Sequence, residues 1–270
     1  MTNEPKKFLS LDEQIDYLIN DKLISFKDKD SARFYLLNHN YFNVISSGKL
    51  KHATNYLDKK HHYANTSFDS WIEFYNNDLK LSKQLRNNVI ELEQLLNSRT
   101  AYYVAELIEV KKIKKRKIQG LIQIIKFTKE IPGFSFLEYE NVETWKFINK
   151  MPFGDLKRVL IWLYSNEVDI YNKIVQGISY LSSKKGDLEE KISETVNLRN
   201  KIMHNTPLSI YLAYANFSQK GGMPNNNIKK SIVKSIYSIN PECGLKEELW
   251  EMCKLSSQMM RMKAKKRPTN

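Results

Sequence analysis

Between residues 78 and 110, apolar side chains recur every three or four positions, which is the spacing of one face of an α-helix. The stripe is formed by Leu81, Leu85, Val89, Leu92, Leu96 and Tyr103. A helix with such a stripe normally buries it against other elements. The chain has only nine Gly and seven Pro and no useful run of alternating apolar and polar residues. We therefore expect an all-α fold with an antiparallel helix bundle at its centre and helical extensions at both ends.

Local signals predict further helices before and after the long one. Ser10 and Glu13 have the spacing of a capping box, which opens a helix through about Asp21. We expect the other helices from Asp28 or Asp30 to Leu37, from Ser67 to Asn76, and over residues 141–148, 154–164, 166–182, 227–238 and 245–262. Residues 38–50 are predicted to form a loop, and the polar residues 51–66 a solvated or RNA-contacting loop.

A length of 270 residues suits one large helical domain or two small ones. We divide the chain into three consecutive segments. They are an N-terminal helical segment with a polar loop (1–66), a helical bundle core (67–215), and C-terminal helices with a basic tail (216–270).

The chain carries 43 Lys and Arg against 30 Asp and Glu, a formal net charge of +13. Such a charge attracts polyanions, and nucleic acid is a better candidate than a membrane surface. No apolar run approaches the roughly 20 residues that a spanning helix needs, and the start MTNEPKK has no signal core. We therefore expect a cytoplasmic protein without membrane contact. Cys243 and Cys253 are interpreted as reduced cysteines, and no metal or cofactor is predicted.

A helix is expected to begin after Asp187 and to end at Asn205, before Pro207. Its apolar residues Leu188, Ile192, Val196 and Met203 fall within about 60° of Arg199 around the helix, with Ile202 at that edge. Arg199 is thus predicted in the middle of an apolar stripe, where a cation needs a carboxylate or phosphate partner. Asn200 and His204 lie beside the stripe and are predicted to converge with Arg199 on one groove.

This combination suits RNA cleavage without a metal ion. An imidazole at His204 gives and takes a proton near neutral pH, and the guanidinium of Arg199 matches phosphate oxygens. The spacing alone is a weak signal, because Arg33 and His39 show it too. Only the second copy combines an Arg on an apolar face with a His at a helix end.

Two polar residues of the long helix lie on or beside its apolar stripe. Arg99 falls inside the stripe and Glu93 flanks it. Glu93 is predicted either to pair with Arg199 or to orient His204. A structural ion pair without a catalytic role is an equally open interpretation.

A basic run directly follows the long helix. It contains Lys111, Lys112, Lys114, Lys115, Arg116 and Lys117. Such a run is either a solvated face or an RNA-binding segment. No aromatic residue interrupts it, so contact with phosphates is expected rather than base stacking.

The segment from Leu198 to Asn205 (LRNKIMHN) looks like the Arg-x4-6-His signature of the HEPN superfamily, in which a polar residue commonly follows the Arg. The wider chain, from about residue 7 to 210, resembles the abortive-infection AbiD/AbiF-like family of bacteria. The similar stretches are KFLSLDEQI (7–15), NHNYF (38–42), Phe68-Asp69, DLKLSKQLR (78–86), Glu93 with Arg99 and Ala101-Tyr102, and MPFGDL (151–156). One departure is Asn97, which stands where relatives often carry Arg; this leaves only Arg99 for that role.

The resemblance implies a homodimeric endoribonuclease of antiphage defence that leaves 2′,3′-cyclic phosphate and 5′-hydroxyl ends. Arg199, Asn200 and His204 would be catalytic, with support from Glu93, Arg99 and Asn205. RNA is then the substrate, and a small RNA inhibitor is a reasonable hypothesis for an antitoxin. The rival interpretations are a non-catalytic RNA-binding protein with a HEPN fold and, less consistent with the charge, a helical scaffold for a partner protein.

Overall fold

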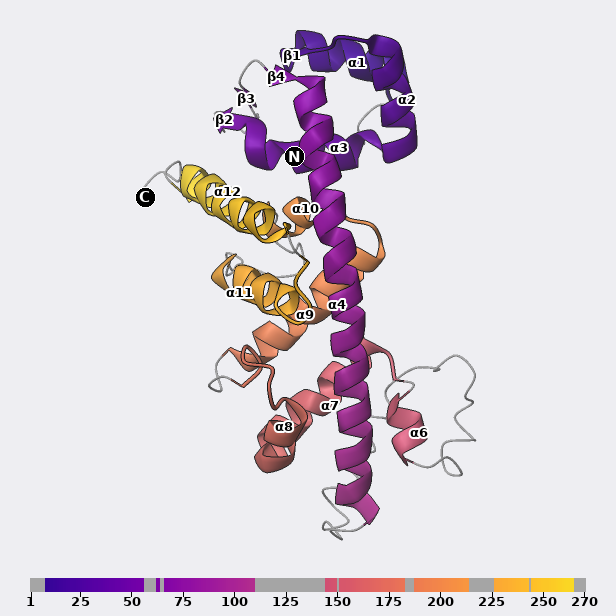
Figure 1. The fold of residues 1–270 in the computed structure, drawn as a ribbon, viewed down its shortest axis with the longest axis vertical. Helices are drawn as coiled ribbons and strands as arrows, with labels where there is room; N and C mark the ends of the chain where they lie inside the picture. The colour runs from indigo at the N-terminus through magenta and orange to yellow at the C-terminus, as the bar shows by residue number, and fades with distance from the viewer. Residues whose placement is uncertain are drawn as a thin grey trace, which may run out of the picture. The chain divides into compact units, whose positions relative to one another are not determined.

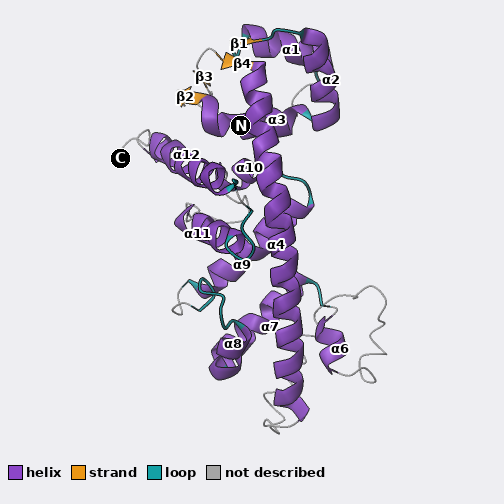
Figure 2. Ribbon diagram, in the orientation of Figure 1, coloured by secondary structure: helices purple, strands orange, loops and turns teal. Residues whose placement is uncertain are grey.

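Helices make up most of the structure, a computed structural model that describes residues 8–55, 62–63, 66–109, 144–149, 151–182, 187–213, 226–242 and 244–264 (Figure 2). The all-α prediction is confirmed. The described strands are very short. β1 (Ile24–Ser25) pairs in parallel with β4 (Thr66–Ser67), and β2 (Ala53–Asn55) pairs antiparallel with β3 (His62–Tyr63).

Figure 1 shows the order of the helices along the chain. They are α1 (Leu11–Asn20), α2 (Lys29–His39), α3 (Tyr41–His52), α4 (Phe68–Glu109), α6 (Thr144–Asn149), α7 (Phe153–Asn166), α8 (Val168–Ile174), α9 (Leu188–Met203), α10 (Leu208–Ala213), α11 (Asn226–Tyr237) and α12 (Lys246–Ala264). Within the described ranges, every helix is too short or too polar to cross a lipid bilayer.

Contacts between Cα atoms group the chain into two compact units. The first unit comprises residues 1–84, 201–226 and 242–270, and the second comprises 85–200 and 227–241. Each unit is built from segments far apart in the sequence, whereas the sequence pattern predicts three consecutive segments. That three-part division stays a prediction.

The helix α4 is unbroken from Phe68 to Glu109 (Figure 1). The expected division into two helices, with a break near Asn76 and Asp78, is therefore wrong. Polar residues of the type Asn-Asn-Asp favour helix ends because their side chains compete for local backbone groups. Here the Asp78 carboxylate instead binds the backbone of a different helix, so α4 continues past it.

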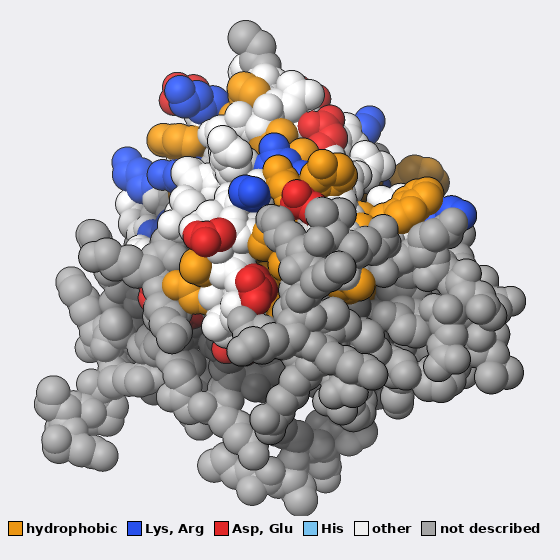
Figure 3. Space-filling view, turned by 90° about the horizontal axis from the view of Figure 1, so that it is seen from below, with side chains coloured by type: hydrophobic (Ala, Val, Ile, Leu, Met, Phe, Trp, Pro, Cys, Tyr) orange, Lys and Arg blue, Asp and Glu red, His pale blue; other side chains and the backbone are white. Residues whose placement is uncertain are grey.

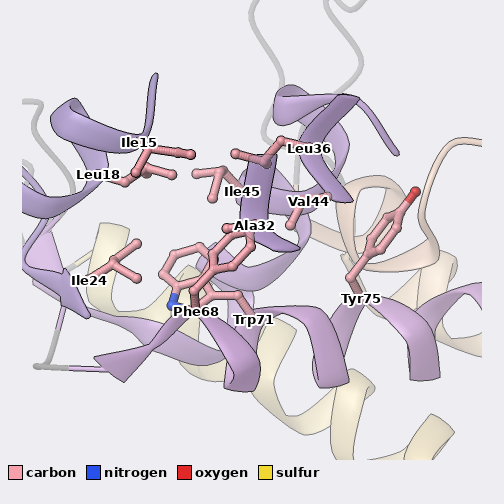
Figure 4. Close-up of a cluster of buried hydrophobic side chains, with 10 residues drawn as sticks. All are labelled: Ile15, Leu18, Ile24, Ala32, Leu36, Val44, Ile45, Phe68, Trp71 and Tyr75. Atoms are coloured by element: carbon pink, nitrogen blue, oxygen red, sulfur yellow. The ribbon is translucent and has the colours of Figure 1, made fainter. Parts of the chain in front are cut away.

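The core of the first unit lies where α1, α2 and α3 cover the first turns of α4. Figure 4 shows its side chains pointing toward one another. They are Ile15 and Leu18 of α1, Ile24 of β1, Ala32 and Leu36 of α2, Val44 and Ile45 of α3, and Phe68, Trp71 and Tyr75 of α4. The capping box expected at the start of α1 is confirmed, since Ser10 and Glu13 exchange both of its hydrogen bonds.

Residues 38–50 do not form the expected loop, because most of them belong to α3. The helix begins after Asn40, whose side chain accepts a hydrogen bond from the amide of Phe42 and whose φ is 60°. The small residues Ser46, Ser47 and Gly48 suggested a turn, but they are buried. At Gly48, the absence of a side chain instead lets the helix lie directly against the ring of Trp71.

The expectation that residues 51–66 form one solvated loop is also wrong at its start. His52 ends α3 with only 8% of its surface exposed, and its ring stacks on Trp71 with centroids 4.8 Å apart. Burial lowers the pKa of His52. This histidine therefore contributes to packing in the first unit. Residues 56–61 and 64–65 of this stretch lie outside the described residues.

Replacing Gly48 by alanine is expected to lower the free energy of unfolding by about 1–3 kcal/mol. A Cβ atom there would lie 2.3 Å from Cε3 of Trp71, so the ring or the helix must shift. Gly154→Ala is the matched control, because a Cβ at Gly154 meets nothing within 4 Å. Urea unfolding of both variants checks the prediction, which is wrong if the two changes cost the same.

In the second unit, polar side chains of α4 bind the ends of shorter helices. The amide nitrogen of Asn88 lies 2.9 Å from the carbonyl oxygen of Ile236 and 3.2 Å from that of Tyr237, at the end of α11. The last carbonyl groups of a helix lack the usual donor four residues further on, and that of Ile236 also accepts a hydrogen bond from the amide of Ile239 at 3.1 Å. The buried Asn88 therefore joins α4 to α11 by satisfying them.

The predicted helix 166–182 is shorter than expected, since α8 ends at Ile174 and turns follow. Gly177 has a φ of 84°, a conformation that glycine adopts without steric cost. The helices predicted near 227–238 and 245–262 agree with α11 and α12 within two residues. The expected helix 141–148 overlaps α6, and 154–164 overlaps α7.

Candidate functional site

The end of α9 is set by the backbone conformation of Asn205, whose φ is 55°. The amide of Asn205 donates to the carbonyl of Ile202 at 3.1 Å, and the amide of Thr206 donates to that of Lys201 at 2.9 Å. This pair of bonds is the Schellman motif, in which a left-handed residue terminates a helix. The motif leaves His204 as the exposed residue between the last helical position and Asn205. Asn205 thus has a structural role as the helix terminator.

Arg199 forms an ion pair with Glu93 of α4. Its Nε lies 3.0 Å from Oε2 of Glu93, and its Nη2 lies 3.4 Å from Oε1. The side chains are 34% and 15% exposed, respectively. This is a side-on, bidentate contact, which fixes the plane of the guanidinium group. Of the two arrangements predicted for Glu93, the structure shows the pairing with Arg199.

The position of Arg199 around α9 differs from the expected one. The buried face contains Leu198 and Thr195 as well as Ile192 and Ile202, which moves its centre away from Arg199. Burial of the Thr195 hydroxyl is tolerated because it donates to the carbonyl of Lys191 at 2.8 Å. Arg199 therefore lies at the margin of the buried face, where its guanidinium group is partly exposed to solvent.

Asn200 is exposed, and its Oδ1 accepts a hydrogen bond of 3.3 Å from Nη1 of Arg199. Glu93, Arg199 and Asn200 form one cluster within the second unit. His204 belongs to the first unit. The convergence of Arg199, Asn200 and His204 on one groove stays a prediction.

Arg99 contacts the end of α8. Its Nη1 donates to the carbonyl of Ile174 at 3.0 Å and to that of Gln176 at 2.6 Å. A guanidinium group is favourable there because the carboxyl end of a helix carries partial negative charge. The structure thus gives Arg99 a helix-capping role, and the supporting role in catalysis stays a prediction.

The basic run at residues 111–117 lies outside the described residues. On the face in Figure 3, the described basic side chains are mixed with acidic and hydrophobic ones. The positive charge of the described residues is therefore not gathered into one patch on that face. Within the part of the chain that the structure describes, no group of three or more His, Cys, Asp or Glu is arranged to hold a metal ion.

Asp78 is a residue whose importance the sequence pattern missed. Its side chain is completely buried and accepts hydrogen bonds from the amide of Leu208 at 2.6 Å and from that of Ser209 at 3.0 Å. The hydroxyls of Ser82 and Ser209 also donate to it. The carboxylate thus caps the start of α10 from the side of α4. The Asp78 carboxylate thereby fixes the backbone at Leu208, four residues after His204.

Burial raises the pKa of Asp78 to about 6, although the hydrogen bonds from Ser209, Leu208 and Ser82 oppose this shift. The ordinary value is 3.8. Between about pH 4 and pH 6 the folded protein therefore binds more protons at Asp78 than the unfolded chain does. Through this window, the contribution of Asp78 to the free energy of unfolding falls as pH rises, by up to about 1.4 kcal/mol per pH unit.

The isosteric variant Asp78→Asn does not titrate and isolates this effect. We expect the stability of the parent relative to the variant to be greater at about pH 5 than at about pH 8. Urea unfolding at both pH values measures the two differences. Equal differences, or a larger one at about pH 8, would contradict the raised pKa.

Arg33 and His39, the first pair with this Arg-to-His spacing, both make structural contacts within the first unit. Arg33 pairs with Asp12 and Asp30. His39 packs against Tyr35 and Tyr75, with ring centroids 4.3 and 5.7 Å apart. His39 is itself the last residue of α2 and is followed by Asn40, so a histidine at a helix end does not distinguish the two copies. The catalytic role of the second copy stays a prediction.

The fold and the cluster define an all-helical protein in which a glutamate of one long helix holds an arginine of another. A family model described as "Abi-like protein" matches residues 34–209, and the chain belongs to this family. The match includes α4, α9 and all residues of the cluster. Comparisons with curated proteins and with solved structures found no match.

Proposed function

We propose that this Abi-like protein is an endoribonuclease of abortive-infection defence with a HEPN-type site. The site is built on Arg199 and His204, and the active form is a homodimer with both His204 side chains near the two-fold axis. Membership of the Abi-like family supports the defence role. The net charge of +13 supports RNA as the substrate.

The observation that carries the proposal is the way Glu93 holds Arg199. The carboxylate of Glu93 accepts hydrogen bonds from Nε and Nη2, along one edge of the guanidinium group. The end formed by Nη1 and Nη2 points away from this edge, and it has hydrogens left for a phosphate. A fixed guanidinium group that is one third exposed is suited to stabilising charge as it develops on the phosphate.

The reaction needs only groups of the RNA and of the protein. One imidazole takes the proton of the 2′-hydroxyl as its oxygen attacks phosphorus, and a second imidazole gives a proton to the leaving 5′-oxygen. The P–O5′ bond breaks, which leaves a 2′,3′-cyclic phosphate and a 5′-hydroxyl. Two copies of His204, one from each subunit, supply the base and the acid. Asn200 orients the arginine through its bond to Nη1.

The test is cleavage of mixed cellular RNA by the purified protein in excess EDTA. We expect fragments with 2′,3′-cyclic phosphate and 5′-hydroxyl ends, in unchanged yield after the chelator is added. Cleavage that stops in EDTA and returns with added Mg²⁺ would show that the mechanism is wrong. Light scattering of the same sample measures whether the active species is a dimer.

The rival function is RNA binding without cleavage, and the Glu93–Arg199 pair gives it a specific basis. A carboxylate beside the guanidinium group neutralises it, and partly buried ion pairs are common structural features. In that case Arg199 serves the packing of α4 against α9 only. RNA would then bind elsewhere on the basic protein.

Glu93→Gln separates the two functions. The change keeps the shape of the side chain and removes its charge, so we expect stability to fall by only about 1 kcal/mol. Cleavage should fall about ten-fold or more, because the guanidinium group is no longer held in one plane. Thermal unfolding and an RNA cleavage assay measure the two effects. A stability loss without a change in cleavage rate favours the structural role.

A nuclease of this kind must be restrained in an uninfected cell. We propose that a small RNA acts as the inhibitor, because a net charge of +13 favours binding of a polyanion. Nucleic acid that copurifies at low salt and is released at high salt is the expected sign. A purified protein with the absorbance spectrum of bare polypeptide at low salt would contradict this proposal.

A further inference from the structure

The second unit has an open cavity of about 760 Å³ that the cluster around Arg199 does not use. Two rows of side chains on α7 line it, and Glu189 from the first turn of α9 completes the lining. The rows are Lys157, Ile161 and Ser165, and Arg158, Trp162 and Asn166. Each row has the four-residue spacing that places side chains above one another on a helix. Its volume lies in the range of small-ligand sites.

The opposite face of α7 explains why these side chains are available. Leu156, Val159, Leu160 and Leu163 are fully buried and anchor the helix in the second unit. The two rows consequently point away from the core, and Trp162 is only half-buried. A tryptophan ring at the edge of an open cavity offers a large contact area to a ligand, and tryptophan is enriched where proteins bind partners.

Among the described residues, Arg158 is the only charged side chain of the cavity lining that forms an ion pair. Arg158 has one long contact, 3.8 Å from Nη1 to Oδ1 of Asp155. Among the described residues, no carboxylate lies within ion-pair distance of Lys157, although Glu189 lines the same cavity. Two cations, a carboxylate and an aromatic ring therefore face one space. They fit a ligand that combines negative charge, a flat ring and hydrogen-bond donors.

We propose that this cavity binds a nucleotide of single-stranded RNA. The base stacks on Trp162, its phosphate contacts Lys157 and Arg158, and Glu189 accepts a hydrogen bond from an amino group of the base. Stacking on aromatic rings beside cationic side chains is the usual way in which proteins bind single strands. Carboxylates accept from base amino groups such as N4 of cytosine. The inference rests on the proposed function only in taking RNA as the ligand.

A single strand fits these groups better than a duplex. In double-stranded RNA the bases are stacked on one another, so Trp162 has no ring to contact. An acidic peptide would satisfy Lys157 and Arg158 but would face repulsion from Glu189. The combination of stacking, phosphate contact and a base acceptor therefore favours an unpaired nucleotide.

The cavity is separate from the proposed cleavage site. Glu189 and Arg199 are ten residues apart on α9, which corresponds to about 15 Å along the helix. Residues at the cavity therefore position RNA without touching the scissile phosphate. Their replacement should weaken binding and raise KM, while kcat at saturating RNA is retained.

The test measures binding in a full-length His204→Ala background, where the proposed cleavage cannot consume the probe. The probe is a fluorescein-labelled single-stranded RNA of mixed sequence, followed by anisotropy. We expect Trp162→Ala to weaken binding about ten-fold or more. Lys157→Gln should lower the slope of log Kd against log salt by about one. Trp250→Ala and Lys254→Gln are the matched controls on α12, where we expect no such change.

Trp162→Phe keeps a ring and should recover most of the affinity, which separates stacking from a loss of folding. Circular dichroism melting checks that each variant is folded. Binding that is equal in the parent, Trp162→Ala and Lys157→Gln proteins would overturn the inference. So would an equal loss of affinity for double-stranded RNA in the Trp162→Ala variant.

The outcomes also separate this inference from the proposed function. If Trp162→Ala binds RNA normally and the protein with His204 cleaves it, the cavity has no role and the nuclease proposal stands. If binding depends on Trp162 but the protein with His204 never cleaves RNA, the cavity proposal stands and the nuclease proposal falls. Single-stranded DNA as a second probe shows whether the 2′-hydroxyl contributes to recognition.

Discussion

Replacing His204 by alanine is expected to lower the rate of RNA cleavage by about 10²–10⁴-fold, which is the usual contribution of a general acid or base. The fold should be unaffected, because His204 is exposed at the end of α9 and the Schellman bonds there are made by backbone groups. Single-turnover cleavage of a labelled RNA, with thermal unfolding of the same samples, measures both effects.

His39→Ala is the matched control, since His39 stands in the same spacing after Arg33 but packs against Tyr35 and Tyr75. We expect this change to reduce stability and to leave the cleavage rate of the folded protein unchanged. A His204→Ala protein that cleaves RNA as fast as the parent would refute the nuclease assignment.

Asp78→Ala is expected to lower the free energy of unfolding by about 2–4 kcal/mol, because each buried group that loses its hydrogen-bond partner costs about 1–3 kcal/mol. The change removes the acceptor of the Ser209 amide and leaves the amide of Leu208 with only Oγ of Ser82, at 3.2 Å. Buried donors without partners are costly. Because α10 begins four residues after His204, we also expect the cleavage rate of the remaining folded protein to fall. Urea unfolding and the cleavage assay measure these two losses.

Asp69→Ala supplies the comparison on the same helix. Asp69 pairs with Lys27 at 3.0 Å, but both side chains are more than half exposed. Pairs of this kind contribute at most about 1 kcal/mol. If Asp69→Ala and Asp78→Ala cost the same, the capping of α10 by Asp78 is not the reason for its burial.

Elements with strong local signals were predictable from the sequence. The capping box of Ser10 sets the start of α1, and the apolar stripe of α4 is buried from Leu81 to Leu96. Both follow from interactions between residues a few positions apart. The errors at residues 38–50 and near Asp78 arose where small or polar residues suggested a turn but contact parts of the chain far away.

At the candidate site too, features with a local sequence signal were predictable, and those set by distant contacts were not. The need of Arg199 for a partner was apparent from its place on a partly apolar helix, and pairing with Arg199 was one of the two roles predicted for Glu93. The helix end at Asn205 was also predictable, because Asn tolerates a left-handed conformation and Pro207 follows soon after. The capping of α8 by Arg99 had no local signal, since its acceptors lie more than 70 positions away in the sequence.

By itself, the sequence determined where most helices lie, which face of α4 is buried and that the chain carries a formal net charge of +13. These properties depend on periodicity and total charge, which are local or additive. Only the tertiary structure decided what Asp78, Asn88 and Arg99 do. Each of them satisfies the end of a helix that is distant in the sequence. A polar side chain on a packed helix can serve local capping, a distant helix or a ligand, and only the folded chain selects among these partners.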